Sequence, residues 1–588
     1  MSNNDVESNY TQHALLVAWG QFAQEIGLIE AIESVSIKQK RYIHTPQRKV
    51  LEFFVAHLAG LKHLQDISLS AHPLDKDYAV AKAWGQAGWA DYSGVSRTLS
   101  GLSWTEVHEI VRVLERVSQP FLDRELQQMR ASGQKHWYDG DLSGLPVANN
   151  SRTFPNASFG HMADEIRLGY QAAVVSLQGI NYRRLWLSVA HHPGDTVSSS
   201  QAEAMVQAAE ARTGLRPRRR TELLGQRIQM LQTRQSVTQQ RRQKQQTAVT
   251  KSQLDLAELA EAIRQQQQAV DELEKVYQAK QRPERPTSHL AKARGRGQHL
   301  QRKQARLQVQ QQAASQRLAK TEALYQQQEE EIASLRQRLA QFEQDNATNP
   351  DPIIAVFRFD AGFGSYENIA LLIEMGYELY TKPYSHKLVN YLHKQLPPQP
   401  AWTRVGKNAE MMAWADYQLN GCPYLLNVAL TRFYTGKTIK HSALLHFGDD
   451  PVTQDLAAWF ATYNGRQTIE AGIKEGKQVF HLHRIKVRSE PAIYLQEQFV
   501  ILAANFIRWA SHWLAQNACP VENSLNVTAL GIKRQVQVAA HASADVVWDS
   551  DGWLLKFSPH SVFAGKVLKL SANVFWPQRS LHFLDHFL

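Results

Sequence analysis

Residues 352–360 read PIIAVFRFD, a continuous apolar run that begins at a proline and ends at an aspartate. A short run without polar alternation is typical of a strand that is buried on both faces of a sheet. Residues 366–375 then have the pattern of a helix, and residues 377–382 have that of another strand. This order predicts an α/β domain with a central strand at residues 352–360.

The chain before this strand contains a second group of strand signals. Residues 134–145 (QKHWYDGDLSGL) form a strand-like run that ends in glycine, and further strand candidates lie at 172–177 and 184–189 before a helix at 198–213. Residues 10–130 instead carry apolar side chains at helical spacing, which predicts an all-helical N-terminal domain. The α/β domain is therefore expected to begin near residue 131.

Between these two groups, residues 221–345 change abruptly in composition, with 30 Gln, no Trp and no Cys. Apolar residues recur at heptad spacing in two arms, at Ile228, Val249, Leu256, Ile263, Val270 and Tyr277 and again at Leu300, Leu307, Ala314, Leu335 and Phe342. Two prolines and two glycines separate the arms, so the pattern predicts an antiparallel coiled-coil hairpin whose shorter arm measures roughly 70 Å. The alternative is a disordered Gln-rich linker, because several core positions are Gln.

The remaining chain completes the division into domains. Residues 400–450 alternate between apolar and polar, long helices are expected at 454–476 and 492–516, and the tail has a mixed, partly β pattern. We therefore expect a helical N-terminal region (1–130), the first part of the α/β core (131–213), the coiled-coil hairpin insertion (214–348), the second part of the core (349–516) with a β-rich insertion near 386–450, and a C-terminal appendage (517–588).

Composition narrows the class of protein. The 588 residues include 66 Lys and Arg against 55 Asp and Glu, a net charge of +11 and a pI near 9.4, which favours a polyanionic partner. Two cysteines cannot form a disulfide framework or a Cys-rich zinc site. No apolar stretch is long enough to span a membrane and no signal peptide is recognisable, so we expect a cytoplasmic protein without membrane contact.

Three acidic residues stand at positions where a fold would present them together. Asp141 follows the first strand of the α/β region, Asp360 ends the central strand, and Glu470 lies on a later helix. Strand ends project side chains into the crevice of an open sheet. Asp139 shares a strand face with Asp141, so it is a second candidate for the same role.

The helix around Glu470 adds a more specific pattern. Tyr463, Arg466, Glu470, Lys474 and Lys477 occupy offsets 0, 3, 7, 11 and 14, which places them within roughly 80° of one helical face. We interpret the nearby Gly465, Gly472 and Gly476 as thinning the helix for a closely approaching polymer. The alternative is a solvated charged face, and the residues alone do not decide between the two.

At this point the sequence resembles a known family. The spacing of Tyr463, Arg466, Glu470 and Lys477 is similar to the Y-(2)-R-(3)-E-(6)-K signature of one large group of DDE insertion-sequence transposases. FRFDAGFG at 357–364 resembles the element around the group's second aspartate, and YDGDLSG at 138–144 resembles its first, with Ser143 where Thr is more usual. The resemblance covers about residues 131–516 with the hairpin excised.

This resemblance implies an RNase H-like mixed-sheet core and a cut-and-paste DNA transposase. Asp141, Asp360 and Glu470 would be the catalytic residues and would hold two Mg²⁺ or Mn²⁺ ions, since carboxylates favour such hard cations. Tyr463, Arg466, Lys474 and Lys477 would contact DNA, and the helical region 1–130 would be a further DNA-binding region. The partners would be double-stranded DNA, at the terminal inverted repeats and in the target, and a second copy forming a homodimer on DNA in the bacterial nucleoid.

Two points depart from the family or leave alternatives open. The family's insertions usually follow the second aspartate, whereas this hairpin precedes Asp360, so the resemblance assigns it no role. Its basic tip could grip phosphates or stay solvated; the tip comprises Arg282, Arg285, Lys292, Arg294, Arg296, Arg302 and Lys303. One alternative function is a domesticated, non-catalytic DNA-binding protein that recruits a partner through the hairpin, and another treats the coiled coil as the main element and the rest as scaffold.

Overall fold

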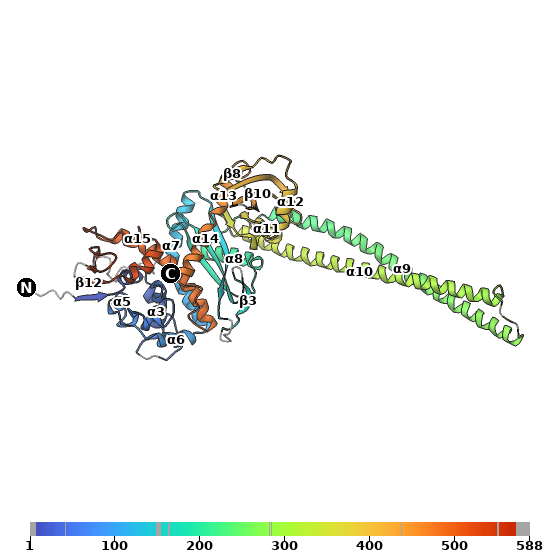
Figure 1. Ribbon diagram of the computed structural model, residues 1–588, viewed down its shortest axis with the longest axis horizontal. Coiled ribbons are helices and arrows are strands. Elements are labelled where there is room, and N and C mark those ends of the chain that lie inside the picture. Colours follow the sequence, from blue (N-terminus) through green and yellow to red (C-terminus); the bar gives the residue numbers. More distant parts are fainter. Residues whose placement is uncertain are drawn as a thin grey trace, which may run out of the picture. The chain divides into compact units, whose positions relative to one another are not determined.

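The computed structural model describes residues 7–40, 43–148, 154–162, 165–281, 283, 285–436, 438–549 and 552–571. The chain folds as two compact units (Figure 1). One contains the chain up to Arg218 and from Asp351 onward, and the other is Arg219–Pro350. Arg282 of the predicted basic tip and residues 572–588 of the predicted appendage lie outside the described residues.

The first unit is built on a mixed sheet, which in the described residues has ten strands. The strand order is β3-β4-β2-β6-β7-β11-β10-β9-β8, with β5 also paired to β4. The strands are β2 (His136–Pro146), β3 (Ser158–Met162), β4 (Glu165–Gln178), β5 (Leu185–Pro193), β6 (Ala355–Arg358), β7 (Glu378–Thr381), β8 (Thr403–Gly406), β9 (Ala409–Gln418), β10 (Leu425–Thr435) and β11 (Thr438–Phe447). β2, β6 and β7 are parallel to one another, and the other pairs are antiparallel.

The central strand confirms the prediction of an α/β fold. All four residues of β6 are buried, because parallel neighbours flank the strand on both sides. Helix α11 (Tyr366–Glu374) connects β6 to β7. The predicted β-rich insertion is only partly β, since it begins with helix α12 (His386–Lys394), and its strands extend the main sheet through pairing of β11 with β7.

Helices cover this sheet. The N-terminal helices α1, α3 and α7 pack against α15, most of whose residues are buried, and the rings of Phe121 and Trp509 stack 4.5 Å apart there. Besides α11 and α12, the described helices of this unit are α1 (Ala14–Glu25), α2 (Leu28–Glu33), α3 (Pro46–Leu58), α4 (Asp66–Leu69), α5 (Tyr78–Ala83), α6 (Tyr92–Ser100), α7 (Trp104–Ala131), α8 (Ala202–Thr213), α13 (Leu456–Asn464), α14 (Gln467–Gln478), α15 (Glu490–Asn517) and α16 (Ile532–Gln537). None of the helices in the described part of the chain combines the length and the apolar character needed to cross a membrane.

A second sheet joins the two ends of the chain, and it corrects the prediction of an all-helical N-terminal domain. Strand β1 (Glu7–Thr11) pairs antiparallel with β12 (Ala544–Asp549), and β13 (Gly552–Phe557) and β14 (Val567–Ser571) complete the sheet. Five residues are too few to reveal a strand period, and the partner strand lies more than 500 residues away in the sequence. The N-terminal and C-terminal regions are therefore structurally joined.

The second unit consists of two antiparallel helices, α9 (Thr221–Ala279) and α10 (His289–Ala347), of 59 residues each. At 1.5 Å per residue, each is about 90 Å long. The buried side chains occupy the predicted heptad positions, including Ile228, Val249 and Val270 on α9 and Leu335 and Phe342 on α10. Ion pairs such as Arg227–Glu331 and Arg294–Glu274 link the two helices. The segment is thus helical, and the disordered-linker alternative is wrong.

Candidate active site

The register of two parallel strands brings Asp141 and Asp360 to the same edge of the sheet. Asp139 of β2 is opposite Arg358 of β6, and both Asp141 and Asp360 follow two residues later. Because the strands run in the same direction, Asp141 lies where β2 continues past the carboxyl end of β6; it is inside β2, which corrects the prediction that Asp141 follows this strand. Gly140 lies between the two aspartates of β2, and a Cβ at this position would lie 2.3 Å from the ring of Phe359.

Asp141 shows that the three predicted acids lie close enough to interact. Its side chain is 16% exposed, and its Oδ1 accepts a hydrogen bond of 2.9 Å from the Leu142 amide. Burial raises the pKa of Asp141 to about 6; the charge of Arg466 opposes this shift, and the charges of Asp360 and Glu470 add to it. A carboxyl group whose pKa is shifted by burial and by neighbouring charges is a common feature of functional sites.

Local hydrogen bonds fix the backbone at Asp360. Its Oδ1 accepts a bond of 2.9 Å from the Gly362 amide, which caps the short helical turn Ala361–Phe363. Its carbonyl accepts a bond of 3.2 Å from the hydroxyl of Thr381, at the end of β7. Asp360 is therefore held by the turn that follows it and by the neighbouring strand β7.

The predicted helix at 454–476 is divided into α13 and α14, which corrects the single-helix prediction. Arg358 donates from Nη1 to the Thr462 carbonyl at 3.0 Å, the acceptor that a continuous helix would use for the amide of Arg466. That amide bonds instead to the carbonyl of Tyr463 at 3.1 Å. Tyr463 thus ends up on α13, Arg466 precedes α14, and Glu470 lies in the first turn of α14.

Arg466 connects two of the three carboxylates. Its guanidinium lies 3.5 Å from Oδ2 of Asp141 and also forms an ion pair with Glu470. The side chain of Arg466 is only 10% exposed, whereas that of Glu470 is 50% exposed. A cation is therefore part of the site itself, and Glu470 is the carboxylate with the most access to solvent.

Asp139, the alternative first ligand, is engaged elsewhere. Arg358 holds it with two hydrogen bonds, from Nε at 2.6 Å and from Nη2 at 2.8 Å, and both side chains are buried. Burial raises the pKa of Asp139, and the charge of Arg358 opposes the shift. With both oxygens bonded, Asp139 positions the strands and has no oxygen directed only to the crevice.

Two lysines and a tyrosine complete the surroundings of the carboxylates. Burial lowers the pKa of Lys477, and the charge of Asp141 opposes that shift. Lys382, which the sequence analysis missed, lies with its ammonium 5.3 Å from the ring centre of Tyr463. Burial and then Arg466 lower the pKa of Lys382, while Glu470 and Asp360 raise it. Its position directly after β7, at the same edge as Asp360, is the signal that could have identified it.

The other predicted DNA contacts behave differently. Tyr463 is buried in the site, and burial raises its pKa to about 12. Lys474 is exposed on α14, and in the described part of the chain no hydrogen bond or ion pair joins it to the three carboxylates. The structure thus assembles Asp141, Asp360, Glu470, Tyr463, Arg466 and Lys477 and leaves Lys474 outside.

The glycines of this region accommodate other parts of the chain, so their interpretation as space for a polymer is wrong. A Cβ at Gly465 would lie 2.2 Å from Arg358 Nη1, and one at Gly472 would lie 2.4 Å from the guanidinium carbon of Arg184. Gly476 packs against Leu482 at ordinary contact distance. The glycines allow buried arginines to cross the helix closely.

Three carboxylates with no cysteine nearby form a donor set that suits a hard divalent cation. The electrostatic effect of Asp360 and Glu470 on Asp141 is the observation that fits such an ion, since a divalent cation would relieve this repulsion. In the described residues, the ligand atoms of this trio do not all lie within 4.8 Å of one another, and Glu470 is engaged by Arg466. The types of ligand atom in this trio therefore suit a divalent cation better than the present distances between those atoms do.

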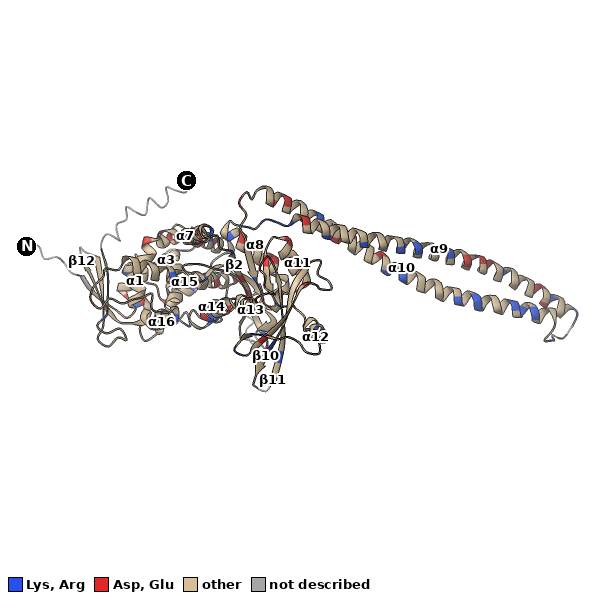
Figure 2. Ribbon diagram, turned by 90° about the horizontal axis from the view of Figure 1, so that it is seen from above, with Lys and Arg blue, Asp and Glu red and all other residues tan. Residues whose placement is uncertain are grey.

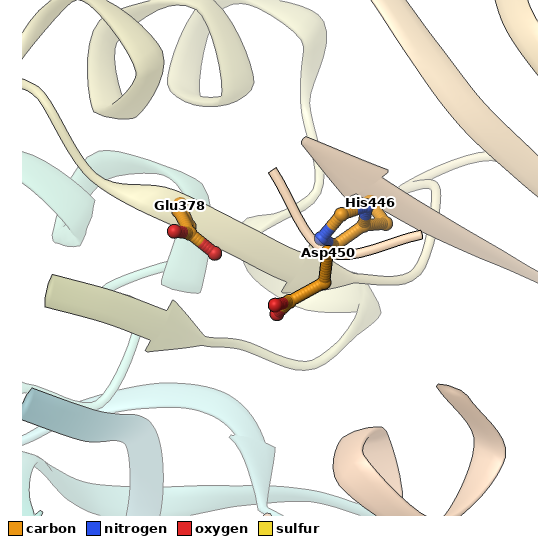
Figure 3. Close-up of side chains that lie close together, drawn as sticks. All are labelled: Glu378, His446 and Asp450. Carbon is orange, nitrogen blue, oxygen red and sulfur yellow. The ribbon is translucent and has the colours of Figure 1, made fainter. Parts of the chain in front are cut away.

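A different group does have ligand atoms within 4.8 Å of one another: Glu378, His446 and Asp450 (Figure 3). Glu378 begins β7, His446 lies near the end of β11, and Asp450 follows that strand. Sequence analysis missed this group because its members come from separate strands without a common motif. It lies at the amino end of β7, whereas Asp360 and Lys382 lie at the carboxyl end of the parallel strands.

Lys135 already supplies a cation to this second group. Its ammonium lies 2.8 Å from Glu378 and 2.8 Å from Asp450. Tyr380 donates a further bond of 2.9 Å to Asp450, and burial lowers the pKa of His446 to about 4, so its ring is neutral at pH 7. We therefore interpret this group as an internal ion-pair network.

Comparisons with known proteins do not assign the chain to a family. No protein-family model matches the chain, and no curated protein matches it.

Proposed function

We propose that this protein is a DNA transposase that cleaves DNA at transposon ends and transfers the strand into target DNA, with Asp141, Asp360 and Glu470 as the catalytic carboxylates. The observation that carries the proposal is the strand register, which sets Asp141 and Asp360 side by side, together with the effect of the Asp360 and Glu470 charges on the pKa of Asp141. The Tyr463–Arg466–Glu470–Lys477 spacing and the FRFD element support it independently.

The topology supports an RNase H-like core. β2, β4 and β5 form an antiparallel series, and β6 and β7 then follow in parallel beside β2. Three antiparallel strands joined by two strands parallel to the first is the arrangement that such a core requires. The paired heptad arms likewise support a coiled coil.

In this proposal the three carboxylates hold Mg²⁺ or Mn²⁺, which when bound would activate the attacking oxygen and stabilise the leaving oxygen. Lys382, Lys477 and Tyr463 line the same crevice and would bind the phosphates next to the scissile bond. Arg466 would release Glu470 when the ions are present and turn its guanidinium to a phosphate. Asp139 and Arg358 hold the strands that present these groups.

One observation favours the non-catalytic alternative. Arg466 pairs with both Asp141 and Glu470, so a cation already occupies part of the space between the carboxylates. In a domesticated DNA-binding protein this pair would be permanent. The two functions differ in whether Glu470 is needed for chemistry or only for the fold.

A cleavage assay separates them. DNA flanking the encoding locus is incubated with the protein and Mg²⁺ or Mn²⁺, and nicking is followed for the wild type and for Glu470→Gln. We expect the wild type to nick the ends and the variant to bind them without nicking, because only a ligand is lost. Full nicking by Glu470→Gln would contradict the assignment, and metal-independent binding without nicking by the wild type would favour the domesticated protein.

A further inference from the structure

The heptad register of the hairpin reveals a strong difference in charge between its two sides. The buried residues set the register of α10, with Leu290, Leu318 and Ile332 at position a and Ala293 and Leu335 at position d. Positions c and g then lie on one side of the seam, and positions b and e lie on the other. In residues 289–320, which contain no Asp or Glu, the cations are distributed very unevenly between these sides.

We call the cations at positions c and g of this segment the basic stripe: Lys292, Arg296, Lys303, Arg306, Arg317 and Lys320. The other c and g positions hold only His, Gln and Ala, and the b and e positions contain a single cation, Arg294, which pairs with Glu274 of α9. All six side chains of the stripe are exposed. Figure 2 shows Lys and Arg gathered along the part of α10 that follows the turn.

The stripe is not neutralised within the hairpin. α9 carries Asp255, Glu258 and Glu272 on the same side, but in the described residues none of the three pairs with the stripe. α9 also extends the basic side with Arg234, Arg241, Lys244 and Lys251, which are exposed. This side of the hairpin therefore has an excess of unpaired positive charge.

Two further features indicate the chemistry of a ligand. The c and g positions of residues 289–320 contain no large apolar side chain, so the stripe lacks the anchors that a protein groove or a lipid surface would require. Gly295 lies within α10 beside the stripe, and a Cβ there would meet nothing within 4 Å. Glycine inside a helix costs about 1 kcal/mol relative to alanine, and no internal contact accounts for it here.

We infer that the basic stripe is a second DNA-binding surface, which follows the phosphate backbone of a duplex without reading its sequence. The stripe extends over 29 residues, from Lys292 to Lys320, and its ends are about 42 Å apart at the rise of a helix, which matches roughly 12 base pairs. The choice of DNA over another polyanion rests on the proposed function. The surface itself lies wholly within Arg219–Pro350 and does not depend on the carboxylate site.

The test measures the salt dependence of binding by two variants of the full chain. Arg296→Gln/Lys303→Gln/Arg306→Gln removes three stripe cations, and Arg264→Gln/Arg294→Gln/Arg336→Gln removes three cations from the opposite side with the same change in net charge. Anisotropy of a labelled duplex of about 30 base pairs, unrelated to any transposon end, is titrated at several KCl concentrations in EDTA. Circular dichroism checks that both variants remain helical, as expected for exposed Gln in a Gln-rich helix.

We expect the stripe variant to lose at least about tenfold in affinity near 100 mM salt and to flatten the slope of log K against log salt by up to about 2.7, because roughly 0.9 counterion is released per phosphate contact and three cations are removed. The control variant should change the slope by less than about 1. Equal changes in the two variants would overturn the inference. A change in self-association that occurs only in the stripe variant would also overturn it, because the stripe would then bind a second copy of the chain. Tighter binding of duplex RNA than of DNA would overturn the choice of ligand. EDTA prevents cleavage, so this outcome is independent of the catalytic proposal.

Discussion

The parallel strands have carboxylates and cations at both of their ends, the amino edge and the carboxyl edge, but the two edges differ in how these charges are paired. At the amino edge, Lys135 bonds directly to both Glu378 and Asp450 at 2.8 Å. At the carboxyl edge, Arg466 bonds to Asp141 and Glu470, but Lys382 and Lys477 form no ion pair with another described residue and have lowered pKa values through burial. The carboxylates of the amino edge are thus paired with a lysine of the protein, whereas the carboxyl edge has two lysines without an ion-pair partner among the described residues.

Whether a charged group is already paired within the protein distinguishes a structural role from a functional one better than the type of residue does. A compact Glu–His–Asp group has the geometry of a metal site, yet its lysine already balances it. The carboxylates at the opposite edge are less tightly grouped, but their mutual repulsion contributes to the raised pKa of Asp141. Unsatisfied charge in a crevice is the stronger indication of function.

The largest expected effect is on cleavage. Asp360→Asn should reduce the nicking rate by at least about 10³-fold, because it removes a carboxylate ligand from the carboxyl edge. Glu378→Gln at the amino edge should retain nicking in the fraction of protein that remains folded. The assay is a single-turnover measurement on end DNA, and equal losses in the two variants would remove the functional distinction between the edges.

The second effect concerns stability at the amino edge. Lys135→Met should lower the free energy of unfolding by about 2–3 kcal/mol, because Glu378 is left buried without its partner. Adding Glu378→Gln should recover much of this loss. Urea unfolding of the two single variants and the double variant measures the coupling, and additive losses would show that the pair does not stabilise the fold.

At the carboxyl edge, replacing a charged residue should raise the free energy of unfolding instead of lowering it. The pKa of Asp141 is about 6 in the fold, above its usual 3.8, so its ionisation destabilises the folded state as pH rises through this range. Asp141→Asn should therefore raise the free energy of unfolding at pH 7 by about 1–3 kcal/mol, and the gain should fade below about pH 4. Unfolding curves at both pH values, recorded in EDTA, provide the check. If Asp141→Asn has a lower free energy of unfolding than the wild type at pH 7, the proposed destabilising effect of ionised Asp141 is contradicted.

The smallest effect is expected at Lys382. Lys382→Met should slow nicking by about tenfold, because one cation beside the reacting phosphate is lost while other contacts retain the DNA. Lys556→Met, on the exposed face of β13, is a matched control and should nick at the wild-type rate. Identical rates for both variants would exclude Lys382 from the site.

Local patterns in the sequence predicted part of this arrangement. The apolar run at 352–360 located the central strand and Asp360, and heptads located both hairpin arms, because such patterns depend on neighbouring residues. The pairing of β1 with β12, the break before Arg466 and the position of Lys135 depend on residues far apart in the chain. No local period encodes such contacts, so the sequence could not reveal them.

Binding of Mn²⁺ tests the central claim most directly. Electron paramagnetic resonance can count the ions bound by the wild type, by Asp360→Asn and by Asp450→Asn at pH 7.5, with end DNA present. The carboxyl-edge account predicts that Asp360→Asn loses Mn²⁺ binding and that Asp450→Asn retains it, because Lys135 rather than a metal balances Asp450. Loss of binding in Asp450→Asn with full binding in Asp360→Asn would contradict the account and move the metal site to the amino edge.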